Sequence, residues 1–435
     1  MRIKALSRGR KGLADADQGS ATFLGISRVI YLGLVGIGFL LAAQVGDPAE
    51  IGTYSLVVAV TAIVTVVAQA GIDRLLLVEV SQLSAAQHFS WRVWWQRRIY
   101  SVILIVVCAI PAAIVDRIAI PAAFLILSRL ILGDLENIGL GRKITNLVAQ
   151  STLANGIISA VAIALAGQHS ASTLVWASSV GNVVASCIII CSMRKRIPDD
   201  VAGDGQLTLR WAQAMPFAGM AVAAAVYQRA DLTMMGLFGL GIAQLAGYAI
   251  ALRAFEALVA FRGAVVQHEA TKWANQDTSS ERVRIWSAKI CAACIGLGFL
   301  VILVSLNVPR TGLLSQYEGL WTLVAVIGIG TPLIGSHTVT STWIYSKPGS
   351  YRTMGLSVAL SCMSIILTIG AILIGGIIGV AAAASIKEYV SYLAFRKILP
   401  SNGINLRAAL EVLMWPAATL VLCGVYLIGR WLIDG

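Results

Sequence analysis

Long uninterrupted apolar runs recur along this chain, and they limit its fold more than any other feature. Many of them reach the roughly 20 residues that a helix needs to cross a hydrocarbon core about 30 Å thick. Hydrophobic residues make up 58% of the 435 residues and charged residues only 12%, so the composition lies outside the range of soluble domains. The runs do not alternate with a period of two, as strands of a membrane barrel would. We therefore predict an all-α polytopic membrane protein.

Thirteen transmembrane helices are predicted from the apolar windows, and the segments between them are short. The helices lie near 21–44, 51–72, 99–115, 118–140, 144–166, 172–193, 214–237, 242–266, 288–306, 320–345, 351–373, 375–395 and 409–432. Residues 1–20 are interpreted as a retained cytoplasmic tail, because the following apolar run is too long for a signal peptide and has no small-residue cleavage site.

The basic residues are distributed very unevenly between the connecting segments. With the N-terminus in the cytoplasm, 24 of the 33 Lys and Arg residues fall in cytoplasmic segments and only 3 in outward ones. The positive-inside rule requires this asymmetry, and it places the C-terminus on the periplasmic side. The net charge of +12 is then mostly a matter of topology, which argues against a nucleic-acid partner.

An aromatic and basic segment, HFSWRVWWQRR (88–98), precedes the third predicted helix. Its tryptophans are interleaved with arginines: Trp91, Arg92, Trp94, Trp95, Arg97 and Arg98. Such a segment is typical of the membrane interface, where aromatic rings and basic groups rest among anionic headgroups. We predict an interfacial anchor here.

A weak internal repeat divides the chain into two halves. An offset of 194 residues places Tyr54 over Tyr248 and aligns AEIGTYSLVVA with AQLAGYAIALR. The pattern predicts two six-helix lobes in the same orientation, an N-lobe at 21–193 and a C-lobe at 214–398, joined by a cytoplasmic linker at 194–213. Segment 399–435 carries one extra C-terminal helix. Parallel repeats of this kind build transporters whose site lies between the lobes.

Two stretches resemble the polysaccharide (O-antigen type) flippases of the multidrug/oligosaccharidyl-lipid/polysaccharide (MOP) exporter superfamily. Segment 45–82, beginning VGDPAEIGTYSLVV, is similar to the family's second helix and its following turn. Segment 215–258 contains VYQRADLTMMG and GYAIALRAFEAL, which are similar to a seventh helix with its Asp and a Gly-Tyr-opened eighth helix with an Arg. The resemblance extends to about residue 398, and the thirteenth helix departs from the family's usual twelve or fourteen.

The resemblance implies transport of an undecaprenyl-pyrophosphate-linked oligosaccharide across the bacterial inner membrane by alternating access, in exopolysaccharide or lipopolysaccharide O-antigen synthesis. It implies the lipid-linked glycan and membrane lipids as partners, with a coupling cation (H⁺ or Na⁺), a polysaccharide polymerase and chain-length proteins as further candidates. Two alternatives stay open. One is a multidrug or small-cation antiporter of the same superfamily, and the other is a non-transport scaffold of a polysaccharide assembly complex.

No catalytic residue, cofactor or metal site is predicted. The four histidines lie far apart in sequence without ligand spacing. The seven cysteines form an odd set that lies almost entirely within apolar runs, where a small buried hydrophobe is the simpler interpretation. The outward segments are also too short to hold an extracytoplasmic catalytic domain.

Ionisable residues inside the spans are the candidate functional residues. Each costs about 2.5–3.5 kcal/mol on insertion scales, so such residues face a cavity or one another. They are Arg28, Arg129, Asp134, Glu136, Arg229, Asp231, Arg253, Glu256, Arg262, Lys387 and Glu388.

Three of these arginines, Arg28, Arg229 and Arg253, are predicted to bind the substrate's diphosphate as cavity cations. A guanidinium is always charged and forms bidentate contacts with phosphate. Arg28 has no acidic neighbour on its own helix, so it is the strongest candidate. Arg229 points to nearly the opposite face from Asp231, so at most one of the two shares a face with Arg253.

The remaining charges are assigned to cation coupling or to pairing between helices. Asp231 lies at a depth similar to that of Arg253, and a structural clamp between them or a functional role both fit. Glu256 follows Arg253 by three residues and is placed to neutralise it.

Arg129 is expected to pair with Glu136 on its own helix. For Lys387, which lies nearer the inner leaflet, snorkelling toward the membrane surface is favoured. Glu388 beside it is kept as a further coupling or pairing candidate.

Overall fold

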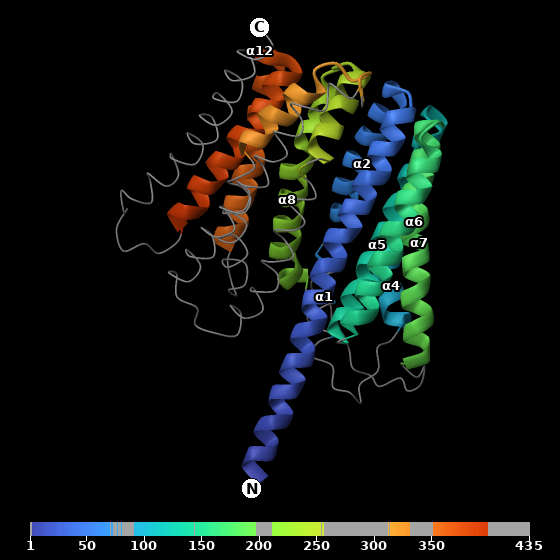
Figure 1. Ribbon diagram of the computed structural model, residues 1–435, viewed down its shortest axis with the longest axis vertical. Coiled ribbons are helices and arrows are strands. Elements are labelled where there is room, and N and C mark those ends of the chain that lie inside the picture. The colour runs from blue at the N-terminus through green and yellow to red at the C-terminus, as the bar shows by residue number, and fades with distance from the viewer. Residues whose placement is uncertain are drawn as a thin grey trace. The chain divides into compact units, whose positions relative to one another are not determined.

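The structure is a computed structural model, and it describes residues 2–69, 71–72, 76, 80, 91–142, 144–196, 211–253, 255, 312, 314–330 and 351–398. Every regular element in these residues is a helix, which confirms the all-α prediction for this part of the chain (Figure 1). Among the described residues, five helical segments are long and apolar enough to cross a membrane: Phe23–Val45, Pro48–Gln69, Thr145–Ala166, Ala171–Met193 and Met354–Ala394.

The chain forms two compact units, which are described separately. The first comprises Met1–Arg229 with Tyr351–Val358, and the second comprises Ala230–Ser350 with Ala359–Gly435. The helices of the first unit are α1 (Arg2–Val45), α2 (Pro48–Gln69), α4 (Trp91–Val115), α5 (Ala119–Gly141), α6 (Thr145–Ala166) and α7 (Ala171–Arg196).

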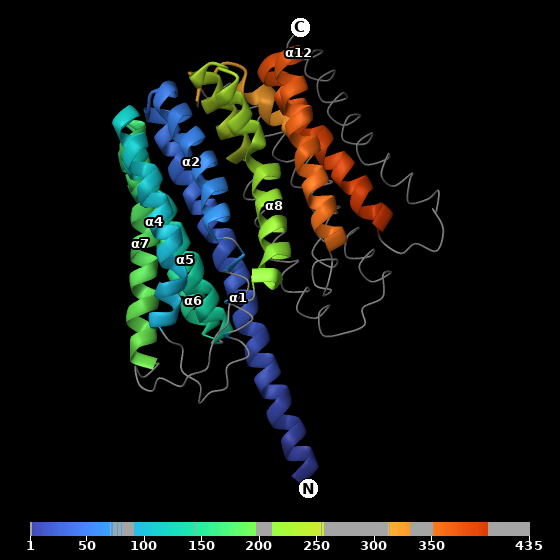
Figure 2. The same cartoon turned by 180° about the vertical axis from the view of Figure 1, so that it is seen from behind.

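Most of the second unit's described residues belong to the end of α8 and to α12. Helix α8 (Trp211–Leu237) begins in the first unit and ends in the second, and α12 (Tyr351–Ile398) lies mostly in the second. The second unit also contains helical residues 242–253 and 320–330. Figure 2 shows the same helices from behind.

Acidic side chains fix the starts of two helices in the first unit. Helix α2 starts at Pro48, and the Asp47 carboxylate accepts a hydrogen bond from the Ala49 backbone N–H at 2.9 Å. The Glu50 carboxylate, in the first turn of α2, accepts a hydrogen bond from the Ala171 N–H at 2.5 Å. Since Ala171 is the first residue of α7, Glu50 satisfies an otherwise unpaired donor there and ties the starts of the two helices together.

Glycines allow α1 and α6 to pack backbone to backbone. A Cβ on Gly38 of α1 would collide with the backbone carbonyl of Ala160 in α6, and one on Gly156 of α6 would lie 2.9 Å from the Cα of Tyr31. Small residues at such crossings are the usual means by which membrane helices associate, because lipid supplies no hydrophobic driving force between them.

Polar side chains are buried where α2, α5, α6 and α7 meet. Asn155 of α6 donates a hydrogen bond to the Oδ1 of Asn182 in α7 at 3.1 Å, and Asn182 donates to the Oγ of Ser128 in α5 at 3.3 Å. The hydroxyls of Tyr54 in α2 and Ser178 in α7 share a hydrogen bond of 2.7 Å. All five side chains are buried, so these bonds link four helices away from lipid.

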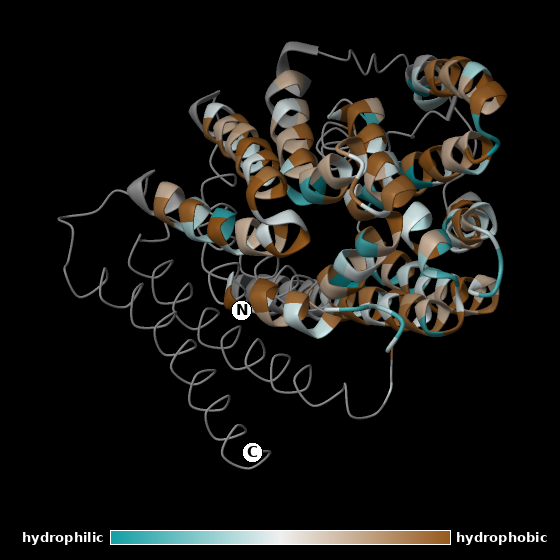
Figure 3. Cartoon of the chain, turned by 90° about the horizontal axis from the view of Figure 1, so that it is seen from above, coloured by the Kyte–Doolittle hydropathy of each residue, from teal (hydrophilic) through white to brown (hydrophobic). Residues whose placement is uncertain are grey.

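Large apolar side chains cover the lipid-facing sides of the helices. On α4, Ile110, Ile114 and Val115 are 61%, 84% and 88% exposed. Figure 3 shows apolar residues along nearly every described helix, with hydrophilic residues confined to short stretches. A surface this apolar is suited to hydrocarbon and would be unfavourable in water, which agrees with a multi-pass membrane protein.

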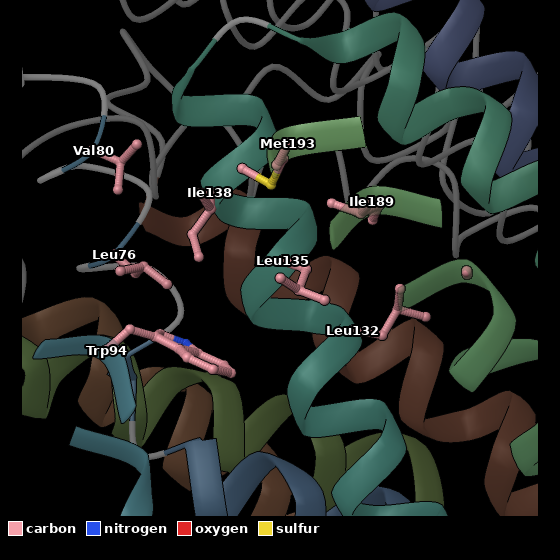
Figure 4. Packing of buried hydrophobic residues seen from close by; sticks show 9 residues of the cluster. Leu76, Val80, Trp94, Leu132, Leu135, Ile138, Ile189 and Met193 are labelled. Carbon is pink, nitrogen blue, oxygen red and sulfur yellow. The ribbon is translucent and has the colours of Figure 1, made fainter. Parts of the chain in front are cut away.

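An apolar cluster packs α4, α5 and α7 together in the first unit (Figure 4). Trp94 of α4 lies in it, with Leu135 and Ile138 from α5 and Ile189 and Met193 from α7. Trp94 is only 8% exposed, whereas its neighbour Trp95, stacked on it with ring centroids 5.1 Å apart, is 53% exposed.

This packing corrects the prediction for segment 88–98. Helix α4 begins at Trp91 and not near residue 99, and Trp94 and Arg98 are buried inside the protein. The prediction of an interfacial anchor is therefore wrong for these two residues. The physical reason is that Arg98 has a carboxylate partner on another helix, described below, which removes the need for headgroups.

Helix α12 consists of two helical arms joined by a reversal at Gly376. Gly376 has φ 54° and ψ −139°, a conformation open essentially only to glycine. A Cβ on Gly379 would collide with the carbonyl oxygen of Ala371, so the chain folds back on itself here. The two arms correspond to the predicted helices 351–373 and 375–395.

Several predicted elements lie outside the described residues. They include the helices near 288–306 and 409–432, much of 242–266 and 320–345, and most of the linker 194–213. The count of thirteen helices and the parallel repeat therefore stay predictions.

Candidate functional site

A buried carboxylate in the second unit is the centre of a polar cluster formed by α8, the helical residues 242–253 and both arms of α12. Asp231, on the last turns of α8, accepts a hydrogen bond from the Tyr248 hydroxyl at 2.8 Å and one from the Thr368 hydroxyl at 3.2 Å. The ammonium of Lys387 forms an ion pair with Asp231 at 2.7 Å. We call these four residues the Asp231 cluster.

Two glycine turns bring the members of the Asp231 cluster together. After Leu237, Gly239 adopts φ 70°, which ends α8 and turns the chain so that Tyr248 on the next helical segment returns to Asp231. The reversal at Gly376 places Thr368 on one arm of α12 and Lys387 on the other. Both arms can therefore deliver a donor to the same carboxylate.

The charges in this cluster are almost completely withdrawn from solvent and lipid. Asp231 is 1% exposed and Lys387 is 5% exposed. An isolated charge in such a place would be very unfavourable, but an ammonium and a carboxylate 2.7 Å apart neutralise each other through a charge-assisted hydrogen bond. The cluster is thus a neutral unit that links α8 to both arms of α12.

A second buried ion pair lies in the first unit, between α4 and α5. The Arg98 guanidinium donates to both oxygens of the Asp134 carboxylate, and both side chains are completely buried. The indole N–H of Trp94 donates to the same carboxylate at 2.9 Å, and Arg98 donates to the carbonyl oxygen of Gln69, the last residue of α2, at 3.3 Å. The charges of this pair are satisfied within the protein, and its bonds tie α4 to α5 and to the end of α2.

A third ion pair, between Arg28 of α1 and Glu136 of α5, is longer and more exposed. The two groups are 3.8 Å apart, and their side chains are 31% and 22% exposed. These atoms attract each other but are too far apart to share a hydrogen bond. Compared with Arg98 and Asp134, which are completely buried, this pair is partly accessible.

The structure changes two of the predicted pairings. The cation bonded to Asp231 is Lys387, where the sequence suggested Arg253, and the ion-pair partner of Glu136 is Arg28, where the sequence suggested Arg129. Arg129 donates a hydrogen bond to the Thr61 hydroxyl at 3.4 Å.

The prediction that Lys387 snorkels to the membrane surface is wrong. Its ammonium has a buried carboxylate within 2.7 Å, and this contact satisfies the charge without any extension of the side chain toward water.

The other predicted site residues are placed as follows. Arg229 and Arg253 are half-buried and Glu388 is 8% exposed. Arg229 is the last residue of the first unit before the chain enters the second. Glu256 and Arg262 lie outside the described residues.

Sequence reasoning missed Tyr248, Thr368 and Arg98 as members of polar clusters. A hydroxyl inside an apolar run carries little signal, because it can also bond to its own helix backbone, as Thr65 does with the Thr61 carbonyl at 2.7 Å. Tyr248 did stand out in the repeat alignment, opposite Tyr54. Both tyrosines are buried and both hydroxyls are hydrogen-bonded.

Among the described residues, no group of three or more His, Cys, Asp or Glu side chains is placed to hold a metal ion.

Comparison with known proteins gives a fold and no closer relationship. No family model matches the chain, and no curated protein matches it. Solved structures do match. The lipid II flippase MurJ, in an inward closed conformation, has a TM-score of 0.68 at 15% identity, covering 94% of this chain and 92% of that one.

Multidrug transporters match as well. An inward-facing multidrug resistance MATE family transporter of the MOP superfamily has a TM-score of 0.58 at 13% identity, covering 87% of this chain and 98% of that one. The MATE multidrug transporter DinF-BH has a TM-score of 0.60 at 12% identity, covering 88% of this chain and 94% of that one. The chain therefore shares the fold of these solved structures.

Proposed function

We propose that the protein carries an undecaprenyl-pyrophosphate-linked oligosaccharide from the inner to the outer leaflet of the bacterial inner membrane by alternating access. The fold supports a transporter, and the solved structures that share it include a lipid II flippase. The proposed orientation, with a cytoplasmic N-terminus and a periplasmic C-terminus, follows from the asymmetry of the basic residues.

Such a substrate makes specific physical demands. Its diphosphate and glycan must pass the hydrocarbon core while the prenyl tail stays in lipid. The transporter therefore needs a cation within the membrane that can bind the diphosphate and then release it. Arginine suits this role because its guanidinium stays charged and binds phosphate through two parallel hydrogen bonds.

Arg28 is the residue that carries this proposal. Its side chain is 31% exposed, and its acidic partner Glu136 is held at 3.8 Å, beyond hydrogen-bond length. A diphosphate oxygen could approach within hydrogen-bond distance and replace Glu136 as the counter-ion. The buried Arg98 could not serve in this way, because both oxygens of Asp134 already bond to it. Arg253 and Arg229 are proposed as further cavity cations.

The test is export of polysaccharide in a strain that lacks its own flippase, with membrane levels of each variant checked by immunoblot. Arg28→Ala and Arg253→Ala are expected to lose surface polysaccharide at normal membrane levels. Loss of about 1.5–3 kcal/mol of charge-assisted hydrogen bonding weakens binding about 10- to 150-fold.

Arg117→Ala is the matched control, because Arg117 is exposed in the connection between α4 and α5 and should be replaceable without effect. Arg28→Lys keeps the charge but not the planar fork, so partial export is expected. Wild-type export in both alanine variants would refute the cavity assignment.

Multidrug or small-cation antiport is a second candidate, because MATE transporters share the fold, DinF-BH with a TM-score of 0.60. Drug accumulation in a strain without its own efflux pumps separates the two functions. A chain that lowers drug accumulation and does not restore polysaccharide is an antiporter. A scaffold of an assembly complex, working with a polymerase and chain-length proteins, would tolerate replacement of every charge in the spans.

A further inference from the structure

The Asp231 carboxylate is already supplied with donors by the protein itself. Its Oδ2 atom receives the Lys387 ammonium at 2.7 Å and the Tyr248 hydroxyl at 2.8 Å, and its Oδ1 atom receives the Thr368 hydroxyl at 3.2 Å. These donors come from three helical segments. A carboxylate in a transporter that was kept ready for a free coupling ion would instead need an oxygen open to that ion.

We propose that Lys387 is a built-in cation of the Asp231 carboxylate, and that Asp231 binds no free alkali cation while this pair is intact. The ammonium occupies the position at which a sodium or potassium ion would neutralise the carboxylate. Asp231 is then not the residue that binds a coupling ion, and its charge serves to hold Lys387.

The charge balance at the site supports this assignment. Asp231 and Lys387 are 1% and 5% exposed, so water screens them little. A free cation that reached either carboxylate oxygen would come close to the Lys387 ammonium, and like charges repel strongly where the surroundings are poorly polarisable. It would also have to replace hydroxyl donors that are already well placed.

The two-armed form of α12 supports it as well. Thr368 and Lys387 belong to opposite arms that meet at Gly376, and Asp231 holds a bond to each arm. Departure of Lys387 to admit an ion would break the bond that holds one arm of α12 to the carboxylate. Such a rearrangement is unfavourable, because separating the two charges of a buried ion pair is costly.

The inference rests on the proposed transport function for its consequence, which is that any coupling ion must bind elsewhere in the chain. Its test does not need a substrate. The purified full chain is unfolded thermally in detergent, in sodium chloride and in choline chloride at equal ionic strength, because an ion that binds the folded state raises the midpoint in a saturable way.

The wild-type protein is expected to have the same unfolding midpoint in both salts. Lys387→Met, which keeps an unbranched side chain but removes its charge, is expected to unfold at a lower temperature in choline chloride, and sodium is expected to restore its midpoint saturably. Lys387→Arg keeps a cation at the site and should remain indifferent to sodium.

The double variant Asp231→Asn with Lys387→Met removes both charges, and its midpoint should also be indifferent to sodium. The double variant also covers the case in which Lys387→Met alone is too unstable to purify. A stable double variant would then show that the single variant fails because the Asp231 carboxylate has lost its cation. A saturable sodium effect on the wild type that Asp231→Asn abolishes would overturn the proposal. A Lys387→Met protein as indifferent to sodium as the wild type would overturn it too.

These outcomes are independent of the transported substrate. A protein that fails to export polysaccharide can still show the predicted sodium response in Lys387→Met, and a protein that exports polysaccharide can lack it.

Discussion

Two buried tyrosines of this chain differ mainly in the charge of the group to which they are bonded. The Tyr248 hydroxyl donates to the Asp231 carboxylate at 2.8 Å, whereas the Tyr54 hydroxyl shares a 2.7 Å bond with the Ser178 hydroxyl. Both rings are almost completely buried, at 0% and 2% exposure. Removal of either hydroxyl leaves the ring packing in place, so the pair isolates what a hydrogen bond to a buried charge contributes.

Tyr248→Phe is expected to destabilise the protein more than Tyr54→Phe. Hydrogen bonds to charged groups contribute about 1.5–3 kcal/mol and those between neutral groups about 0.5–1.5 kcal/mol. The measurement is the thermal unfolding midpoint of each purified variant in the same detergent. Equal losses in the two variants would show that the charge on Asp231 is neutralised by Lys387 so fully that the hydroxyl adds nothing special.

At the scale of helices, the close approach of α1 and α6 depends on residues without side chains. Gly38 touches the Ala160 backbone, while Gly36, two residues earlier on the same helix, has open space where its Cβ would lie. The two positions differ in environment but not in residue type or helix. They form a natural pair for testing whether the crossing is set by sterics.

Gly38→Ala is expected to destabilise the first unit by about 1–3 kcal/mol, because the new methyl group must push two backbones apart. Gly36→Ala is expected to be neutral or to stabilise the helix by up to about 1 kcal/mol, since alanine is the better helix former. Unfolding midpoints of the two variants give the comparison. A Gly38→Ala protein as stable as Gly36→Ala would mean that α1 and α6 can separate without penalty.

For the molecule as a whole, the orientation in the membrane stays a prediction from charge, and it can be tested directly. In a background whose seven cysteines are replaced by alanine, single cysteines are introduced at Arg117, His169 and Lys195. The first two are exposed residues of short connections and should react with a membrane-impermeant maleimide in intact spheroplasts. Lys195→Cys should react only after the membrane is permeabilised. The reverse labelling pattern would show that the topology is the opposite of the predicted one.

The helices were largely predictable because hydrocarbon demands long apolar runs. The predicted spans 118–140, 144–166 and 172–193 correspond to helices Ala119–Gly141, Thr145–Ala166 and Ala171–Arg196. The start of α4 was not predictable in the same way. Arg98 lies in a segment rich in charged residues, which sequence reasoning assigns to a connection between helices. Its partner Asp134 is 36 residues away on another helix.

The candidate site was predictable only in its charged members. Asp231 and Lys387 are conspicuous in apolar runs because a buried charge is expensive. Their pairing was not evident, since they are 156 residues apart and helix periodicity relates residues only within one helix. Thr368 was invisible for a different reason, because a single hydroxyl adds little cost to a span.

The reversal at Gly376 has a genetic consequence. Gly376 has no side chain, and each of the two arms that meet there carries one donor to Asp231, Thr368 on one and Lys387 on the other. A substitution at Gly376 is therefore expected to have the same phenotype as a substitution at Asp231, although it leaves the carboxylate in place. A genetic screen for loss of function would group the two positions together.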